Sequence, residues 1–207
     1  MSQPSERLYL YPLWIRIWHM TNALLCLVLI ITGLSMQYST PSTMVKFSVA
    51  VSVHNLAGII LSISYVVFFL GNLFTGNGVH YVISVSGFIK RLYGQFMYYT
   101  VGIFKKTAPP YPVSEELKFN PLQQFSYVAI MYFIVPLVVL SGWGLLFPQI
   151  TVNSLFGVSG LDLTDIVHIV MGFFISIFMC VHIYFCTIGK SPLSNFKSMI
   201  DGYHETH

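Results

Sequence analysis

The chain has 207 residues, of which 55% are hydrophobic and only 8% are charged. Soluble domains carry about 25% charged residues, so this composition excludes an ordinary soluble domain. The formal net charge of +3 is too small to indicate a nucleic-acid-binding surface, and no basic run with interleaved aromatic residues occurs. We therefore expect an integral membrane protein that contacts lipid and has no nucleic-acid partner.

Four apolar segments are long enough to cross a bilayer, which takes about 20 apolar residues. We expect them at residues 12–36, 47–74, 121–147 and 163–189. The predicted fold class is an all-α membrane protein, a four-helix transmembrane bundle that forms a single domain over residues 1–207. Pro136 lies inside the third span and predicts a kink there. The chain opens without a short hydrophobic region and cleavage site, so we expect an uncleaved first helix.

The positions of Lys and Arg predict the orientation of the bundle. Nine of the ten basic residues fall on one side of the four spans, and only Lys46 falls on the other side, which also holds Asp162 and Asp165. We expect both termini and the long loop at residues 75–120 to be cytoplasmic. The nine basic residues are Arg7, Arg16, Lys90, Arg91, Lys105, Lys106, Lys118, Lys190 and Lys197.

The long loop divides into two halves of different composition. Residues 80–104 mix aromatic and aliphatic side chains with Lys90 and Arg91, a pattern that predicts an amphipathic helix at the membrane interface. The prolines that follow from residue 109 exclude helix, so that half is expected to be extended. We expect three histidines outside the spans to be solvated and without a role, namely His80, His204 and His207.

Four histidines lie inside the spans, where an ionisable side chain is expensive and calls for a functional reason. His168 and His182 are 14 residues apart on the fourth span. This spacing is close to four turns of about 3.6 residues, so both rings face nearly the same way, roughly 21 Å apart along the axis. The predicted topology places His54 level with His168 near the outer surface and His19 level with His182 near the inner surface. This is the layout of two stacked bis-histidine haems.

Glycines in register with these histidines support the haem interpretation. Gly58 and Gly172 each follow an outer histidine by four residues, which is one turn on the same helix face. A side chain at either position would collide with a flat macrocycle between the helices. Gly33 follows His19 by 14 residues and would lie beside the outer haem. Neutral imidazole on both faces of the ring suits haem iron.

The histidines also admit other interpretations. A lone membrane histidine is more often an interhelical hydrogen-bond partner than a metal ligand, but that explanation leaves the register of all four unexplained. A transporter with a histidine proton relay predicts further carboxylates in the spans, and Asp165 is the only candidate. Cys26, Cys180 and Cys186 fall in the spans without a C-x-x-C-H motif, so we expect packing cysteines and no covalent haem.

Several segments resemble a known family. Trp14-Ile-Arg-Ile-Trp-His19 resembles an R-x-x-H-W start of helix one, although Trp18 here precedes the histidine. Val53-His-Asn-Leu-Ala-Gly58 resembles an H-x-x-x-G helix two, and Lys118-Phe-Asn-Pro-Leu-Gln-Gln124 resembles the K-[YF]-N-x-x-Q that opens helix three. With the two histidines of helix four, the chain resembles the bacterial four-helix dihaem cytochrome b family. This family includes the b-type membrane subunits of nickel–iron hydrogenases, formate dehydrogenases and thiosulfate-reductase-like enzymes, and the bacterial cytochrome b561 proteins.

The resemblance implies a bacterial cytoplasmic (inner) membrane protein that carries two b haems and transfers electrons between a redox partner and quinone or menaquinone. The partner would be a periplasmic subunit such as an iron–sulfur protein, a hydrogenase, a molybdoenzyme or a multihaem cytochrome. The chain would be the quinone-reactive subunit of an oxidoreductase complex, with no catalytic residue for bond chemistry. A stand-alone cytochrome b561-type oxidoreductase and a haem-free membrane anchor or transporter stay open as alternatives.

The resemblance also implies a quinone site by the inner haem, with Asn120 and Gln123 at the matching positions. Amides can hydrogen-bond a quinone carbonyl without burying a charge. Asn120 could equally cap the third helix beside Pro121, and Leu122 replaces a glycine of the family. Arg16, one turn before His19, could pair with an inner-haem propionate or serve as a snorkelling anchor.

Overall fold

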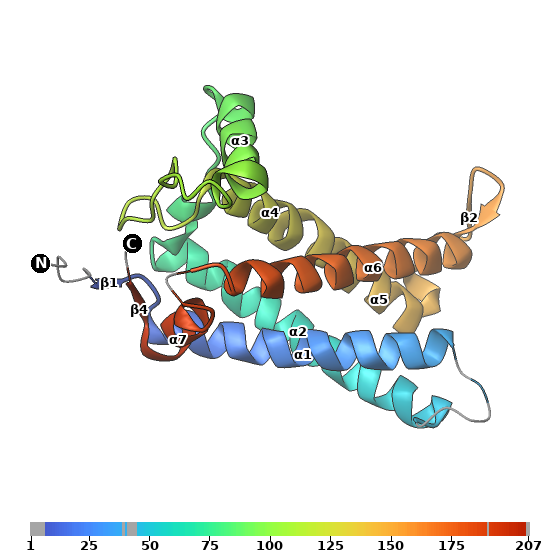
Figure 1. Cartoon of the computed structure of the whole chain (residues 1–207). Helices are drawn as coiled ribbons and strands as arrows, with labels where there is room; N and C mark the ends of the chain where they lie inside the picture. Colours follow the sequence, from blue (N-terminus) through green and yellow to red (C-terminus); the bar gives the residue numbers. More distant parts are fainter. Residues whose placement is uncertain (1–6, 39, 41–44, 190, 206–207) are drawn as a thin grey trace, which may run out of the picture. The chain divides into compact units, whose positions relative to one another are not determined.

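The computed structural model describes residues 7–38, 40, 45–189 and 191–205, so the expectations for Lys190 and His207 lie outside the described residues. Four long apolar helices confirm the predicted transmembrane bundle (Figure 1). Each helix end lies within three residues of its expected position. The four are α1 (Leu13–Gln37), α2 (Phe47–Phe74), the continuous run Pro121–Leu146 and α6 (Gly160–Cys186).

The third span changes its helical type in the middle. It runs as α4 (Pro121–Ala129), then as the π-helical segment η3 (Ile130–Ile134), then as α5 (Val135–Leu146). Pro136 lies two residues after the π-helical segment and lacks the N–H that an α-helix needs at that position. The irregularity expected at Pro136 therefore takes the form of a widened turn just before it.

The chain forms two compact units, each built from separate stretches of sequence. Unit 1 comprises Met1–Arg16, Gly71–Met131 and His182–His207, and unit 2 comprises Ile17–Leu70 and Tyr132–Val181. Of the nine basic residues that the structure describes, eight belong to unit 1 and only Lys46 to unit 2. The segments that carry positive charge therefore gather in one unit, and the membrane orientation predicted from the sequence stays a prediction.

The two ends of the described chain pair with each other in unit 1. Strand β1 (Arg7–Tyr9) pairs antiparallel with β4 (Tyr203–Glu205), directly after α7 (Ser194–Asp201). The Arg7 guanidinium forms an ion pair with Asp201 at 2.7 Å. The strands are three residues long, too short for a period-two pattern to predict them. His204 is thus a half-buried residue of strand β4.

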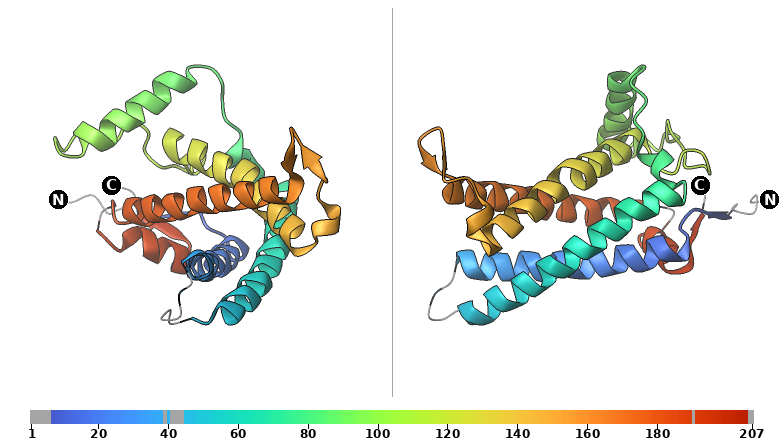
Figure 2. Two further views of the ribbon diagram at one scale, coloured as in Figure 1. Left: turned by 90° about the vertical axis from the view of Figure 1, so that its right-hand side faces the viewer. Right: turned by 180° about the vertical axis from the view of Figure 1, so that it is seen from behind.

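The long loop contains the expected helix in shortened form. It runs as a 3-10 turn η1 (Asn77–Tyr81), the amphipathic helix α3 (Phe88–Met97) and the π-helical segment η2 (Tyr98–Gly102). The Arg91 guanidinium donates to the carbonyls of Ser84 and Ser86 and thereby closes the turn before α3. Figure 2 shows α3 from two further sides. No regular element follows until α4, as the prolines predict.

Aromatic and small polar side chains join the helices of unit 2. Trp18 of α1 stacks on Phe68 of α2 at 4.5 Å, and its indole N–H donates to the Ser64 carbonyl at 3.0 Å. Leu25 of α1 packs with Ala57 and Leu61 of α2 in the small buried core. Two short strands precede α6 in this unit, β2 (Ser154–Leu155) and β3 (Val158–Ser159), after the 3-10 turn η4 (Pro148–Ile150).

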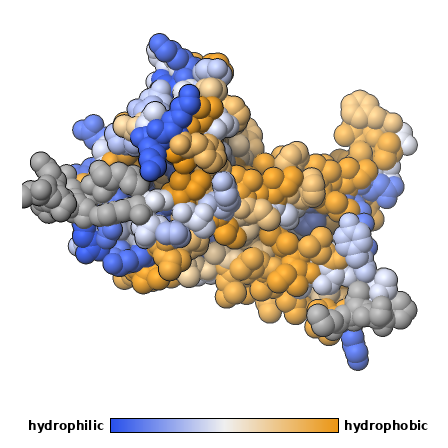
Figure 3. All heavy atoms as spheres, in the orientation of Figure 1, coloured by the Kyte–Doolittle hydropathy of each residue, from blue (hydrophilic) through white to orange (hydrophobic). Residues whose placement is uncertain are grey.

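Apolar side chains cover the outside of the spanning helices. Most of the leucine, isoleucine, valine and phenylalanine side chains of α1, α2 and α6 are exposed, and Figure 3 shows the hydrophobic surface that they form. A water-soluble protein rarely exposes contiguous apolar patches of this kind. This surface fits the hydrocarbon core of a bilayer.

A close approach in unit 1 requires a glycine near the end of α2. A Cβ atom at Gly71 would lie 2.6 Å from Cζ3 of Trp14, well inside van der Waals contact. The indole ring of Trp14 occupies the space that a side chain at residue 71 would need.

We predict that Gly71→Ala destabilises the protein by about 1–3 kcal/mol, because overpacking forces a ring or the backbone to move. Thermal unfolding of the detergent-purified chain measures the loss. The double variant Gly71→Ala/Trp14→Leu should recover much of the melting temperature, since the smaller side chain vacates the space. Equal stability of Gly71→Ala and the wild type would contradict the close contact.

Candidate haem and quinone sites

Helices α2 and α6 bring two of the predicted ligands together in unit 2. The imidazole rings of His54 and His168 lie edge to face, with centroids 6.1 Å apart. Metal–imidazole bonds are about 2 Å long, so two rings that share one metal ion have centroids only about 6 Å apart. The outer histidines therefore already have the separation that a bis-histidine site requires.

Polar atoms of α1 surround the ring of His54. Its Nδ1 lies 2.9 Å from Oγ1 of Thr32, and the Leu29 carbonyl also hydrogen-bonds the ring. The Thr32 Oγ1 lies 2.7 Å from the Val28 carbonyl, which accepts the hydroxyl proton in the arrangement where Nδ1 of His54 donates to Thr32. In that tautomer the lone pair lies on Nε2, the other ring nitrogen.

His168 is held in the same tautomer by different residues. Its Nδ1 lies 3.1 Å from the Val138 carbonyl and 3.1 Å from Oγ of Ser141. A carbonyl only accepts, and the Ser141 hydroxyl already donates to the Leu137 carbonyl at 2.7 Å. Nδ1 must therefore be the donor, and the Nε2 lone pair stays available for a metal ion.

These polar partners are what metal-binding histidines usually have behind them. A ligating imidazole commonly donates its second N–H to a carbonyl or another oxygen, which orients the ring and raises its basicity. Thr32 and Ser141 were not among the residues predicted to form the site, although a small polar residue in an apolar span is a visible signal. The donor set at the outer level fits a bis-histidine b haem.

Two glycines of the spans border histidine rings, and two others face open space. A Cβ atom at Gly33 would lie 3.5 Å from Cε1 of His54, so this glycine borders the imidazole ring of His54, and its predicted place beside the outer haem stays a prediction. Gly142, which the sequence analysis did not single out, borders His168 in the same way at 3.1 Å. A Cβ atom at Gly58 or Gly172 would meet nothing within 4 Å. The macrocycle contacts predicted for these glycines stay a prediction.

The inner ligands belong to different units, His19 to unit 2 and His182 to unit 1, so their pairing stays a prediction. Nε2 of His182 lies 3.8 Å from Sγ of Cys186, and its ring lies 6.0 Å from that of Tyr127. The guanidinium of Arg16 donates to the Ile200 carbonyl near the C-terminal end of α7. A cation is favourable there, and this contact gives Arg16 a structural role that the sequence did not suggest.

Asn120 caps α4, as one of the two interpretations predicted. Its Oδ1 accepts from the backbone N–H groups of Leu122 and Gln123, at 3.1 and 3.0 Å. The Gln123 side chain completes a capping box by accepting from the Asn120 N–H at 3.2 Å. One of the two N–H groups of the Asn120 Nδ2 donates to the Tyr99 hydroxyl at 2.8 Å. Quinone binding by Asn120 and Gln123 stays a prediction.

Comparison with known proteins adds to this geometry. The family model described as prokaryotic cytochrome b561 matches residues 10–202, which is nearly the whole chain. The chain belongs to the prokaryotic cytochrome b561 family. A protein of Escherichia coli (strain K12) named "Putative cytochrome YdhU" is 38% identical over 201 residues, which cover 97% of this chain and 76% of that protein. The chain is therefore a b561-type membrane electron-transfer protein of the bacterial inner membrane, and the family binds b-type haem.

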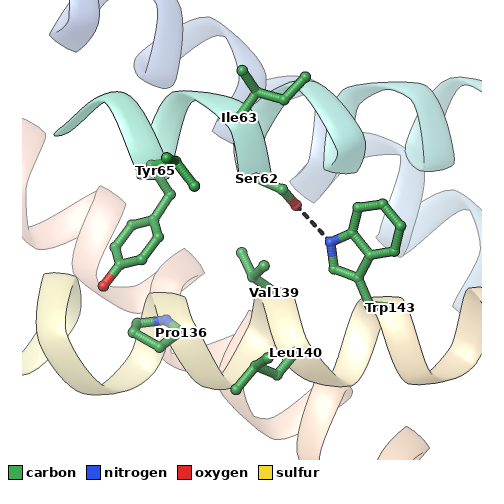
Figure 4. Close-up of a pocket in the computed structure, with 8 residues that line it drawn as sticks. Ser62, Ile63, Tyr65, Pro136, Val139, Leu140 and Trp143 are labelled. Carbon is green, nitrogen blue, oxygen red and sulfur yellow. Dashed lines mark hydrogen bonds between the residues drawn. The ribbon is translucent and has the colours of Figure 1, made fainter. Parts of the chain in front are cut away.

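A shallow apolar groove of this cytochrome lies apart from the histidines. It runs between α2 and α5 in unit 2 and has a volume of about 520 Å³. Figure 4 shows Trp143 on its wall donating to the Ser62 hydroxyl, at 3.0 Å. No histidine lines the groove, so we do not assign it a role in haem binding. Its lining consists of Ser62, Ile63, Tyr65, Val66, Pro136, Val139, Leu140 and Trp143.

Unit 1 of the cytochrome buries a lysine without a carboxylate. Lys118 is only 5% exposed, and its Nζ donates to Oδ1 of Asn77 at 3.2 Å and lies over the Tyr11 ring at 4.9 Å. Among the described residues, the one Lys or Arg ion pair is that of Arg7 with Asp201. Burial lowers the pKa of Lys118 to about 8. His80, expected to be solvated, instead packs on Phe119, and burial and Lys118 lower its pKa.

The lowered pKa of Lys118 predicts a pH-dependent stability. An unfolded lysine has a pKa near 10.4, so between about pH 8 and 10.4 the unfolded chain binds more protons than the folded one. The free energy of unfolding should therefore rise with pH through this window. At neutral pH the cost of burying the charge is on the order of 3 kcal/mol, at 1.36 kcal/mol per pKa unit.

We predict that Lys118→Met raises the melting temperature at pH 7 and that this gain shrinks toward pH 10. Thermal unfolding of the detergent-purified cytochrome across this range measures it. Lys197→Met, which changes an exposed lysine of the same unit, serves as the matched control. A gain that does not vary with pH would contradict the burial of a protonated Lys118.

Proposed function

We propose that this cytochrome carries two b-type haems and transfers electrons between a redox partner at the outer membrane face and quinone near the inner face. His54 and His168 would hold the outer haem, and His19 and His182 the inner one. When bound, a haem supplies reversible one-electron transfer at its iron. The chain's own residues hold the haems, fix the ligand tautomers and exclude water.

The outer histidine pair is the observation that carries this proposal. Two rings on different helices lie at a ligand-sharing distance, and each donates its Nδ1–H to protein oxygens. Two histidines that only pack together could satisfy each other with a single hydrogen bond from one ring to the other. Two imidazoles with Nε2 lone pairs and oriented Nδ1–H groups are the arrangement that a metal ion between them favours.

The proposal for the inner haem rests on the helix register. His182 follows His168 by 14 residues on the uninterrupted helix α6, so the two rings share one helix face at different depths. The His182 Nε2 lies 3.8 Å from the Cys186 thiol. A thiol is a weak hydrogen-bonding group, so iron can replace it at little cost.

Quinone near the inner face is supported by the polar groups at the start of α4. Asn120, Gln123 and Tyr99 supply amide and hydroxyl groups, with His182 on another helix of the same unit. The Gln123 amide uses its oxygen in the capping box, which leaves its N–H₂ group for a ligand. Neutral donors of this kind recognise a quinone without adding a charge at membrane depth.

A stand-alone cytochrome b561-type oxidoreductase fits the family equally well. The two functions differ in whether a partner is required. The partner that we propose is a periplasmic redox subunit, namely an iron–sulfur protein, hydrogenase, molybdoenzyme or multihaem cytochrome. Purification of the tagged cytochrome from its native membrane separates them, because only the subunit function requires a second redox protein in stoichiometric amount.

We predict close to two b haems per chain in the detergent-purified wild type, measured by a dithionite-reduced minus oxidised spectrum with pyridine haemochrome quantitation. His182→Ala should lose the inner haem and keep the outer one, and His168→Ala should do the reverse. Each variant should therefore retain about one haem, with different midpoint potentials in a redox titration. His80→Gln, which changes a histidine outside the spans, should retain both.

One haem per wild-type chain, or loss of both haems in His182→Ala but not in His168→Ala, would contradict the two-plus-two pairing. A wild type without haem would remove the proposal altogether and favour a packing role for the histidines.

A further inference from the structure

Tyr99 joins the loop helix to the start of α4 and the end of α6 within unit 1. It lies in η2, directly after α3, and its hydroxyl accepts a hydrogen bond from Nδ2 of Asn120 at 2.8 Å. Its ring packs against that of Phe185 at 4.6 Å, and Phe185 follows the predicted ligand His182 by three residues on α6. The half-buried Tyr99 side chain thus contacts both Asn120, at the start of α4, and helix α6, which carries His182.

A second amide converges on the same hydroxyl. Gln95 on α3 is only 2% exposed, and its side chain also hydrogen-bonds the Tyr99 hydroxyl. The Oε1 atom of Gln95 is buried without a hydrogen-bond partner among the described residues. A buried acceptor without a partner is rare in a native protein and calls for a specific explanation.

The hydrogen bonds among Tyr99, Asn120 and Gln95 leave the proton of the Tyr99 hydroxyl without an acceptor. A tyrosine hydroxyl has one proton to donate and lone pairs that accept. The lone pairs of Tyr99 receive the amides of Asn120 and Gln95, and no described residue accepts its proton. Burial raises the pKa of Tyr99, against the smaller effect of the two amides, so the hydroxyl keeps its proton at neutral pH.

Most of the hydrogen-bonding capacity of the Asn120 side chain is used within the protein. Its Oδ1 accepts from two backbone N–H groups of α4, and its Nδ2 donates to Tyr99. Only the second N–H of Nδ2 is left for a ligand, since Oδ1 holds the helix cap and the first N–H binds Tyr99. The contact with Tyr99 orients the tyrosine hydroxyl.

We infer that the Tyr99 hydroxyl donates the hydrogen bond that holds a carbonyl of the quinone head group, with Asn120 and Gln95 orienting it. This inference rests on the proposed function and names the residue that contacts the substrate. A quinone carbonyl is a neutral acceptor that matches the spare O–H. The quinol form carries hydroxyls that match the unused Gln95 oxygen. The neighbouring Phe185 ring offers an apolar surface for the flat quinone ring.

The variant Tyr99→Phe tests this, because it removes the hydroxyl and keeps the ring. The water-soluble naphthoquinol menadiol serves as the reductant of the detergent-purified, haem-loaded cytochrome, and haem reduction is followed by stopped-flow absorbance. We expect the KM for menadiol to rise about tenfold, the loss that follows when one hydrogen bond is removed, while the dithionite-reduced spectrum stays unchanged. Tyr98→Phe removes the neighbouring hydroxyl and should leave the KM as in the wild type.

The outcomes separate the inference from the proposed function. If menadiol fails to reduce the haem-loaded wild type, the proposed quinone function is wrong. If menadiol reduces the wild type and Tyr99→Phe has the same KM, the quinone binds elsewhere and the inference is overturned. A change in kcat without a change in KM also overturns the binding role. If Tyr99→Phe loses its haem spectrum, Asn120→Ser decides: it keeps a cap but loses the donation to Tyr99, so a raised KM supports the inference and an unchanged KM overturns it.

Discussion

The hydrogen bond from each outer imidazole Nδ1–H to an oxygen of a neighbouring helix is the constraint on which unit 2 depends. His54 reaches α1 through Thr32, and His168 reaches α5 through Ser141 and the Val138 carbonyl. Because a histidine in hydrocarbon must satisfy its N–H, these bonds fix where α1 and α5 lie beside the ligand helices. The same bonds leave Nε2 as the lone-pair atom on both rings. The same Nδ1 hydrogen bonds therefore position the helices and leave Nε2 available to bind a metal ion.

The parts of this molecule that the sequence predicts well are those set by local spacing. The four spans follow from the length of their apolar runs, and their ends agree with the structure to within three residues. The outer pair of His54 and His168 followed from depth alone, because a helix rises by a fixed amount per residue. The cap by Asn120 followed from its position before Pro121, where a side-chain oxygen meets free backbone N–H groups.

The parts that the sequence did not predict depend on contacts between distant segments. The guanidinium of Arg16 donates a hydrogen bond to the carbonyl of Ile200, 184 residues away, and no local sequence pattern predicts such a contact. Trp18 packs on Phe68 inside unit 2, and nothing in its neighbours along the chain indicates this partner. The contact of Tyr99 with Asn120 was hidden for the same reason, since η2, which carries Tyr99, meets α4 only in the folded chain. Thr32 and Ser141 differ from these, because a polar residue in an apolar span is itself a signal.

The polar groups at the inner end of the protein divide into two kinds. The buried cation, Lys118, faces an amide and aromatic rings, and no ligand-binding group that we propose touches it. The groups near the proposed quinone site are neutral: the amides of Asn120, Gln123 and Gln95 and the hydroxyl of Tyr99. A fixed charge beside a quinone would favour one redox form over the other and would be costly at membrane depth. Neutral donors and acceptors can bind the oxidised and the reduced ring alike, as reversible electron exchange with a quinone pool requires.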